Sequence, residues 1–151
     1  MKGLLIIAAT LFTFFLAPST FAHPTPPTGF WETFDDNDRD PTSIVEVREI
    51  NGQLQGKIVK LFLEPGAPSN PICKKCPGKY KNMPLLGMNI LWGLSPKNDE
   101  WINGHMLSPK KGQIVKASAK MTNDDTLTVR GYKNAFLSKT VTWKRVKNPN
   151  N

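Results

Sequence analysis

Short runs of alternating apolar and polar residues, separated by turn residues, recur along most of this 151-residue chain. In residues 113–121, for example, small or apolar side chains at every second position alternate with two lysines and a serine. A period of two residues places each set of side chains on its own face of a strand, so the pattern predicts a half-buried β-strand. No stretch keeps the helical spacing of apolar residues for three turns, so little α-helix is expected.

Eight runs are predicted to be strands: 29–34, 43–50, 54–63, 86–94, 101–107, 113–121, 126–132 and 139–146. Asn51-Gly52, Lys111-Gly112 and Asn123-Asp124-Asp125 mark turns, because Gly, Asn and Asp tolerate turn conformations. The apolar phase changes inside residues 54–63, which predicts a β-bulge or burial on both faces. The number and spacing of the strands predict an all-β fold, a small antiparallel eight-stranded barrel or a barrel-like sandwich.

The first 22 residues have the three parts of a secretory signal peptide. Lys2 precedes an apolar run over residues 4–16, and small residues stand at Thr20 and Ala22, where signal peptidase requires them. A membrane-spanning helix needs about 20 apolar residues, so this run is too short to be an anchor. We therefore expect cleavage after Ala22 and export to the periplasm or the extracellular space.

The rest of the chain has the size of one domain. We expect residues 23–28, which are proline-rich, to form a flexible leader, residues 29–147 a single β domain and residues 148–151 a tail. The signal peptide holds one Lys and no acid, so its removal lowers the formal net charge from +8 to +7. This charge favours anionic partners, although scattered lysines also simply solvate a sheet. Export argues against nucleic acid, no second run is long enough to span a membrane, and a monomer is expected.

The connection over residues 64–84 holds five prolines, two glycines and both cysteines. Long loops inside small domains are often functional. Two cysteines in an oxidising compartment normally pair, so Cys73 and Cys76 are predicted to form a structural disulfide. The flanking lysines leave thiol–disulfide exchange open. Zinc would need four ligands, and the chain has only His23 and His105 as histidines, so no metal is expected.

Four further residues are candidates for a binding site. Asp35 and Asp36 begin an acidic stretch that is either a solvated loop or a cation site without a full calcium-binding loop. His105 lies in strand register with Trp101 and is expected in the barrel wall rather than as a general base. Arg130 faces away from its apolar neighbours, where it receives a carboxylate or phosphate or forms a cross-strand ion pair. No nucleophile elbow is present, so catalysis is the minority interpretation.

A series of short motifs follows in a specific order along residues 29–146. It includes G-x-W-x-T-x-D-D from Gly29, S-I-V-E-V from Ser43, C-x-x-C-x-G-x-x-K from Cys73 and T-W-x-R from Thr142. In order and spacing the chain resembles the bacterial domain of unknown function family 2147. The resemblance implies an exported protein with lipocalin-like β architecture, and it implies no reaction.

Lipocalins and fatty-acid-binding proteins share a smaller resemblance with the chain. They pair an early G-x-W with a late arginine that packs across the Trp and closes one barrel end. Trp31 and Arg145 match this pair, so we expect the Arg145 guanidinium within about 6 Å of the Trp31 ring, where cation–π attraction matters.

Together these features favour a protein that binds a small apolar or amphipathic molecule, or an anionic envelope component. The alternatives are an envelope-associated enzyme and a secreted effector or interaction protein that uses the 64–84 loop. No cofactor is expected. A barrel filled by side chains would count against a small ligand, and converging His105, Asp and Arg side chains would favour an enzyme. An exposed apolar patch at Phe136-Leu137 would favour contact with a protein or a membrane.

Overall fold

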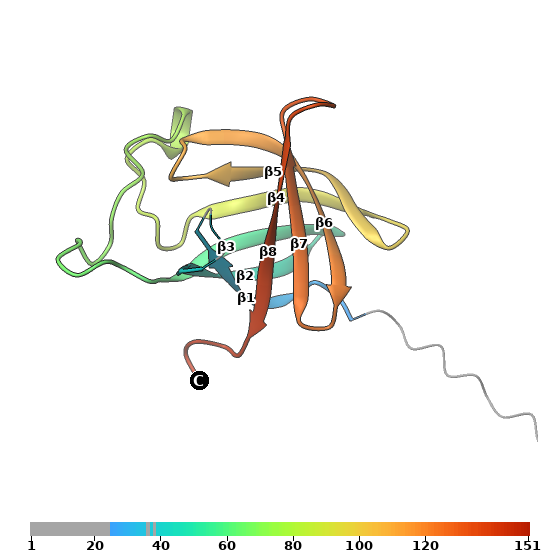
Figure 1. The fold of residues 1–151 in the computed structure, drawn as a ribbon, viewed down its shortest axis with the longest axis horizontal. Coiled ribbons are helices and arrows are strands. Elements are labelled where there is room, and N and C mark those ends of the chain that lie inside the picture. The colour runs from blue at the N-terminus through green and yellow to red at the C-terminus, as the bar shows by residue number, and fades with distance from the viewer. Residues whose placement is uncertain (1–24, 36, 38) are drawn as a thin grey trace, which may run out of the picture.

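The computed structural model describes residues 25–35, 37 and 39–151, and it shows eight antiparallel strands closed into a barrel (Figure 1). The strands are β1 Gly29–Phe34, β2 Pro41–Ile50, β3 Gln53–Leu61, β4 Asn89–Lys97, β5 Glu100–Ser108, β6 Gln113–Asn123, β7 Thr126–Tyr132 and β8 Ser138–Val146, with one 3-10 turn, η1, at Gly78–Tyr80. Neighbours in the chain are neighbours in the barrel, and β1 also pairs with β8. The predicted all-β class and eight-stranded barrel are confirmed. The predicted signal peptide and Asp36 lie outside the described residues.

One strand was predicted at the wrong place. The apolar run predicts a strand at residues 86–94, whereas β4 spans Asn89–Lys97. Leu86 and Gly87 form a turn before the strand, and Leu86 is 45% exposed. At the other end Gly93 has a φ of +74°, which lets the strand change phase and continue to the hairpin at Asn98.

Several strand pairs contain register shifts, and two of these bulges bear on side chains whose orientation was predicted. In β3, Ile58 pairs with Val45 and Lys60 with Ile44, so Val59 is the extra residue of the predicted bulge. A second bulge in β5 was not predicted. Trp101 pairs with the buried Ala119, whereas His105 pairs with the exposed Lys116. His105 and Trp101 therefore do not share a face, because one extra residue between them reverses the alternation.

The two ends of the barrel differ. At the end called here the closed end, tight turns join the strands at residues 51–52, 98–99 and 124–125. The interior near this end is filled by buried side chains, namely Trp31, Val47, Leu54, Leu94, Leu127, Val129 and Trp143. The other end, called the open end, carries the longer connections at 35–40, 62–88, 109–112 and 133–137. No helix in the described part of the chain has the length and apolar character to cross a membrane.

Candidate functional site

A pair of residues from the first and last strands seals the closed end. Trp31 and Arg145 are partners across β1 and β8, and Arg145 Cζ lies 4.3 Å from the centroid of the Trp31 ring. Trp31 is fully buried, and its Nε1 donates a hydrogen bond to the Pro27 carbonyl oxygen at 2.8 Å. The structure therefore brings the two predicted closure residues together within cation–π range.

The Arg145 guanidinium also ties the N-terminal segment to the barrel. Its Nη1 donates to the Thr28 carbonyl oxygen at 2.8 Å and its Nη2 to the Pro26 carbonyl oxygen at 3.0 Å. Its Nε donates to the Asp124 carbonyl oxygen at 2.6 Å, in the β6–β7 turn. Residues 25–28, part of the predicted flexible leader, thus make specific contacts over the closed end that no sequence pattern predicts.

The open half of the barrel holds a cavity of about 270 Å³, called here the main cavity. Ile58, Val141 and Trp143 give it apolar walls, and Leu85 reaches it from the 62–88 connection. Lys110 lines it from the β5–β6 turn. This volume is close to the lower limit of about 300 Å³ for ligand pockets in proteins. A short ligand therefore has room in this half and none at the closed end.

A second cavity of about 270 Å³, called the side cavity, adjoins the main one. The two share part of their lining, at Met106, Ser108, Lys111 and Val141. The side cavity is also lined by Lys133 and Leu137 of the β7–β8 connection. Because Met106 has a long and flexible side chain, its rotamer decides how far the two spaces connect.

Three hydroxyl groups form a polar strip in the wall of the main cavity. Thr33 Oγ1 lies 2.7 Å from Ser43 Oγ and 2.9 Å from Thr42 Oγ1. Thr33 and Ser43 are 7% and 6% exposed, and buried hydroxyls are stable only when hydrogen-bonded. This strip was not predicted from the sequence. The alternation in the sequence does indicate it. Thr33 and Ser43 stand two residues from Trp31 and Val45 on the same strands, so their side chains point to the same inner face.

Asp35 lies at the edge of the main cavity but its carboxylate is already engaged. Its Oδ1 accepts hydrogen bonds from the backbone N–H groups of Arg39 and Asn37, each at 3.1 Å. These bonds, the one from Arg39 most of all, lower the pKa of Asp35 below its ordinary value of 3.8. Asp35 therefore organises the β1–β2 loop. Among the described residues no group of three His, Cys, Asp or Glu is arranged to hold a metal ion.

The other two candidates face outward and lie apart from the cavity. The His105 ring stacks on Trp92 with centroids 5.9 Å apart, and Trp92 stacks on Tyr80 of η1 at 5.8 Å. Arg130 is exposed, and its Nη2 donates to Ser138 Oγ at 3.1 Å. The structure thus does not bring His105, Asp35 and Arg130 together, and the stack instead fixes η1 on the outer face of the barrel.

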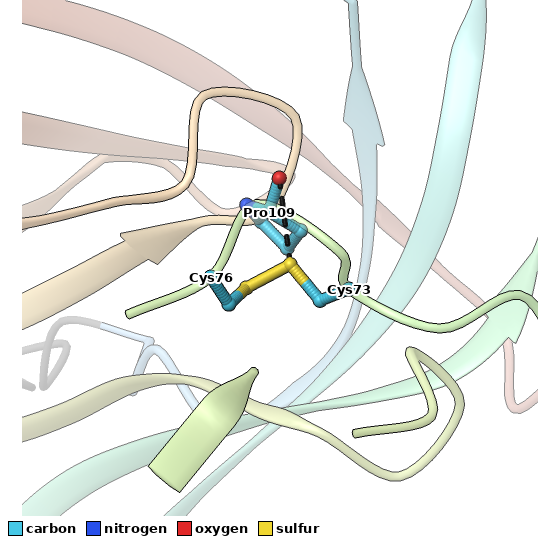
Figure 2. Close-up of a disulfide and its surroundings, with 3 residues drawn as sticks. All are labelled: Cys73, Cys76 and Pro109. Atoms are coloured by element: carbon cyan, nitrogen blue, oxygen red, sulfur yellow. Dashed lines mark hydrogen bonds between the residues drawn. A yellow bond between two sulfur atoms is a disulfide. The ribbon is translucent and has the colours of Figure 1, made fainter. Parts of the chain in front are cut away.

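The 62–88 connection is held against the β5–β6 turn at the open end. Cys73 and Cys76 form a disulfide whose residues are 3% and 2% exposed. Figure 2 shows Cys73 Sγ beside the Pro109 carbonyl oxygen, at 3.5 Å. A disulfide sulfur has no proton to donate, so this is a packing contact. The burial fits a structural disulfide, because thiol–disulfide exchange requires access to a sulfur.

Comparisons with known proteins agree with this geometry. A family model described as "Uncharacterized protein conserved in bacteria (DUF2147)" matches residues 29–145. Among solved structures, protein HP1028 from the human pathogen Helicobacter pylori, described as belonging to the lipocalin family, has a TM-score of 0.68 and 20% sequence identity. The match covers 83% of this chain and 86% of that one. At this identity the likeness shows a shared fold. No curated protein matches the sequence.

Proposed function

This chain belongs to the DUF2147 family, as its motifs predicted, and from that premise we propose that it is an exported protein that binds a small amphipathic molecule in the open half of its barrel. The lipocalin-like fold supports binding, because eight-stranded barrels of this type hold one small ligand. The predicted signal peptide supports export.

The observation that carries this proposal is the asymmetry of the barrel interior. Trp31 and Arg145 seal one end, whereas apolar walls surround about 270 Å³ at the other. Burial of apolar ligand surface against such walls contributes about 25 cal/mol per Å². The apolar part of a ligand therefore enters first, toward Ile58 and Trp143.

The polar groups at the mouth indicate the chemistry of the ligand's head. The hydroxyls of Thr33, Thr42 and Ser43 donate or accept hydrogen bonds. Lys110 adds a positive charge at the rim, and it acts on the Asp35 carboxylate at the cavity edge, so the rim carries both signs of charge. The hydroxyls and the Lys110 ammonium supply hydrogen-bond donors, which favour a head rich in acceptors, such as a carboxylate.

The size of the main cavity limits the ligand. At about 30 Å³ per water molecule, 270 Å³ corresponds to about nine waters. A ligand confined to the main cavity is therefore a short-chain molecule, and a longer one would also need the side cavity. Converging His105, Asp and Arg side chains would have favoured the enzyme alternative, and among the described residues His105, Asp35 and Arg130 lie apart.

Native mass spectrometry of the protein purified from its own host tests the proposal first. We expect a bound small molecule that is released on denaturation. Its fragmentation should identify an apolar chain with an acidic or acceptor-rich head.

A pair of variants on one strand then tests the location. Val141 lines both cavities, and Val141→Phe should fill them, whereas Thr140→Phe adds the same ring on the exposed face. With anilinonaphthalene sulfonate as an amphipathic anionic probe, Val141→Phe should weaken binding by about tenfold or more, about 1.4 kcal/mol. Thr140→Phe should bind as the wild type does. Equal binding by wild type and Val141→Phe would place the probe elsewhere and overturn the proposed site.

A further inference from the structure

The most exposed apolar side chains of the described residues lie on the connection between β7 and β8. Phe136 is 98% exposed and Leu137 57% exposed. In Figure 1 this connection projects at the top of the view, beyond the other strands. An exposed Phe beside an exposed Leu commonly marks a contact site for a protein or a membrane.

The loop holds these side chains outward by its own hydrogen bonds. Asn134 Oδ1 accepts hydrogen bonds from the backbone N–H groups of Phe136 and Leu137, each at 2.9 Å. The Lys133 N–H donates to the Leu137 carbonyl oxygen at 3.0 Å. The turn is therefore closed across its base, and Phe136 stands at the tip.

The exposed large apolar side chains of the described residues gather at the open end. Eight of the nine lie on its connections or in the first residues of a strand that begins there: Phe62, Leu63, Ile72, Met83, Leu86, Ile114, Phe136 and Leu137. Ile50, beside the β2–β3 turn, is the exception at the closed end. The open end carries the longer connections, so what distinguishes the β7–β8 connection is the degree of exposure of Phe136 and Leu137 rather than its place at that end.

Charge is also unequal around the barrel. Lys116 and Arg130 are exposed on the outer faces of β6 and β7, next to the β7–β8 connection, which itself begins with Lys133. The closed-end turns at 51–52, 98–99 and 124–125 contain three aspartates and no Lys or Arg. At the open end the acidic β1–β2 loop lies at the main cavity, whereas Lys133 of the β7–β8 connection lines the side cavity, and further lysines stand on the 62–88 connection and the β5–β6 turn.

We propose that the β7–β8 connection docks this protein onto the surface of an anionic lipid bilayer. Phe136 and Leu137 enter the interface between headgroups and acyl chains, while Lys133, Arg130 and Lys116 contact lipid phosphates. Aromatic and aliphatic side chains flanked by basic residues bind interfaces in this way, and each basic residue near an anionic surface adds to the attraction. Charge complementarity therefore selects an anionic bilayer rather than a neutral one.

Docking in this orientation would bring the side cavity to the bilayer, because Leu137 and Lys133 line its mouth. A lipid-like ligand could then pass between the bilayer and the barrel without crossing bulk water. This last step rests on the proposed binding function, whereas the membrane contact does not.

Vesicle flotation of the protein purified from its host tests the contact. The vesicles contain phosphatidylethanolamine with phosphatidylglycerol, and phosphatidylcholine vesicles serve as the neutral comparison. We expect binding to the anionic vesicles only. Phe136→Ser should weaken it by about tenfold, since a partly buried Phe contributes about 1.5 kcal/mol or more. Ile50→Ser removes an exposed apolar side chain at the closed end and should have no effect, and Phe136→Trp should retain binding.

A second pair of variants tests whether the position of the positive charge matters for vesicle binding. Lys133→Glu should reduce binding to anionic vesicles, whereas Lys147→Glu, with the same change in net charge beyond β8, should not. Equal losses of vesicle binding in both lysine variants, or unchanged vesicle binding in Phe136→Ser, would overturn the proposal. Self-association through Phe136, seen by sedimentation in the absence of lipid, would also overturn it. Binding of anilinonaphthalene sulfonate in solution is measured on the same variants. It should be unchanged in Phe136→Ser, so failure of the docking and failure of ligand binding are separate results.

Discussion

Gly112 of the β5–β6 turn lies against the main chain of Lys75, in the connection that carries the disulfide. A Cβ at position 112 would come within 2.1 Å of the Lys75 carbonyl oxygen and 2.6 Å of its carbonyl carbon. Gly112 also has a φ of +62°, a conformation that side chains disfavour. Together with the packing of Cys73 Sγ on Pro109, this contact holds the connection beside the mouth of the main cavity.

Replacement of Gly112 should therefore release the connection from the barrel. Gly112→Ala should lower the free energy of unfolding by about 1 kcal/mol for the positive φ and by about 1–3 kcal/mol more for the forced displacement of Lys75. Gly52→Ala is the matched control, because Gly52 has a φ of +73° and no atom within 4 Å of an added Cβ. Denaturant unfolding measures both. Equal costs would show that the Lys75 contact contributes nothing.

The contact between Trp31 and Arg145 should be visible as an energetic coupling. Trp31→Ala should cost about 3–5 kcal/mol as the truncation of a buried aromatic residue. Arg145→Ala should cost less, because the side chain is only half-buried. The double variant should deviate from additivity by more than about 0.5 kcal/mol, since contacting residues couple.

Lys144, the neighbour of Arg145 in β8, supplies the control for this double-mutant cycle. Lys144 points outward, where its Nζ lies 5.2 Å from the centroid of the Phe34 ring. Combining Lys144→Ala with Trp31→Ala should give additive costs within about 0.5 kcal/mol. Additivity in the Arg145 cycle as well would mean that the guanidinium does not stabilise the closed end through Trp31.

The disulfide should stabilise the protein only modestly. It closes a loop with a sequence separation of three, and chain entropy gives about 3 kcal/mol for a 15-residue loop and less for a shorter one. The Cys73→Ser/Cys76→Ser variant should therefore fold, with a lower melting temperature. Native wild-type protein should resist thiol labelling. Reduction of an insulin disulfide by the wild type and not by the variant would assign redox chemistry to the pair instead.

The strands and their order could be predicted because the period of two residues is local. Seven of the eight predicted strands lie within two residues of the observed ends, and the Val59 bulge follows from the change of apolar phase in the sequence. The orientation of His105 could not be predicted in the same way. It depends on one extra residue in β5, near Asn103 with its φ of +63°, and no local pattern indicates that residue.

The closure pair and the cavity also depend on residues that are far apart in the chain, and a local pattern does not predict such features. Trp31 and Arg145 lie far apart in the chain, and only their match to a motif shared with known barrels linked them. The main cavity depends on the sizes of all inward side chains at once, including Ser43 and Val141, which leave space where larger residues would fill it. Alternation in the sequence identifies an inward position, but it does not give the volume that remains there.

Met106 should control the length of ligand that the barrel accepts, because it lines both cavities. Met106→Ala removes part of the wall between them and should shift the preference among straight-chain carboxylates toward longer chains. Each additional buried methylene should tighten binding by about 0.8 kcal/mol, which is about fourfold. Competition against anilinonaphthalene sulfonate measures the series. Met121→Ala is the control, because Met121 packs against the core but lines neither cavity, and it should lower stability without moving the optimum. An optimum that stays at the same length in Met106→Ala would mean that the two cavities do not act as one site.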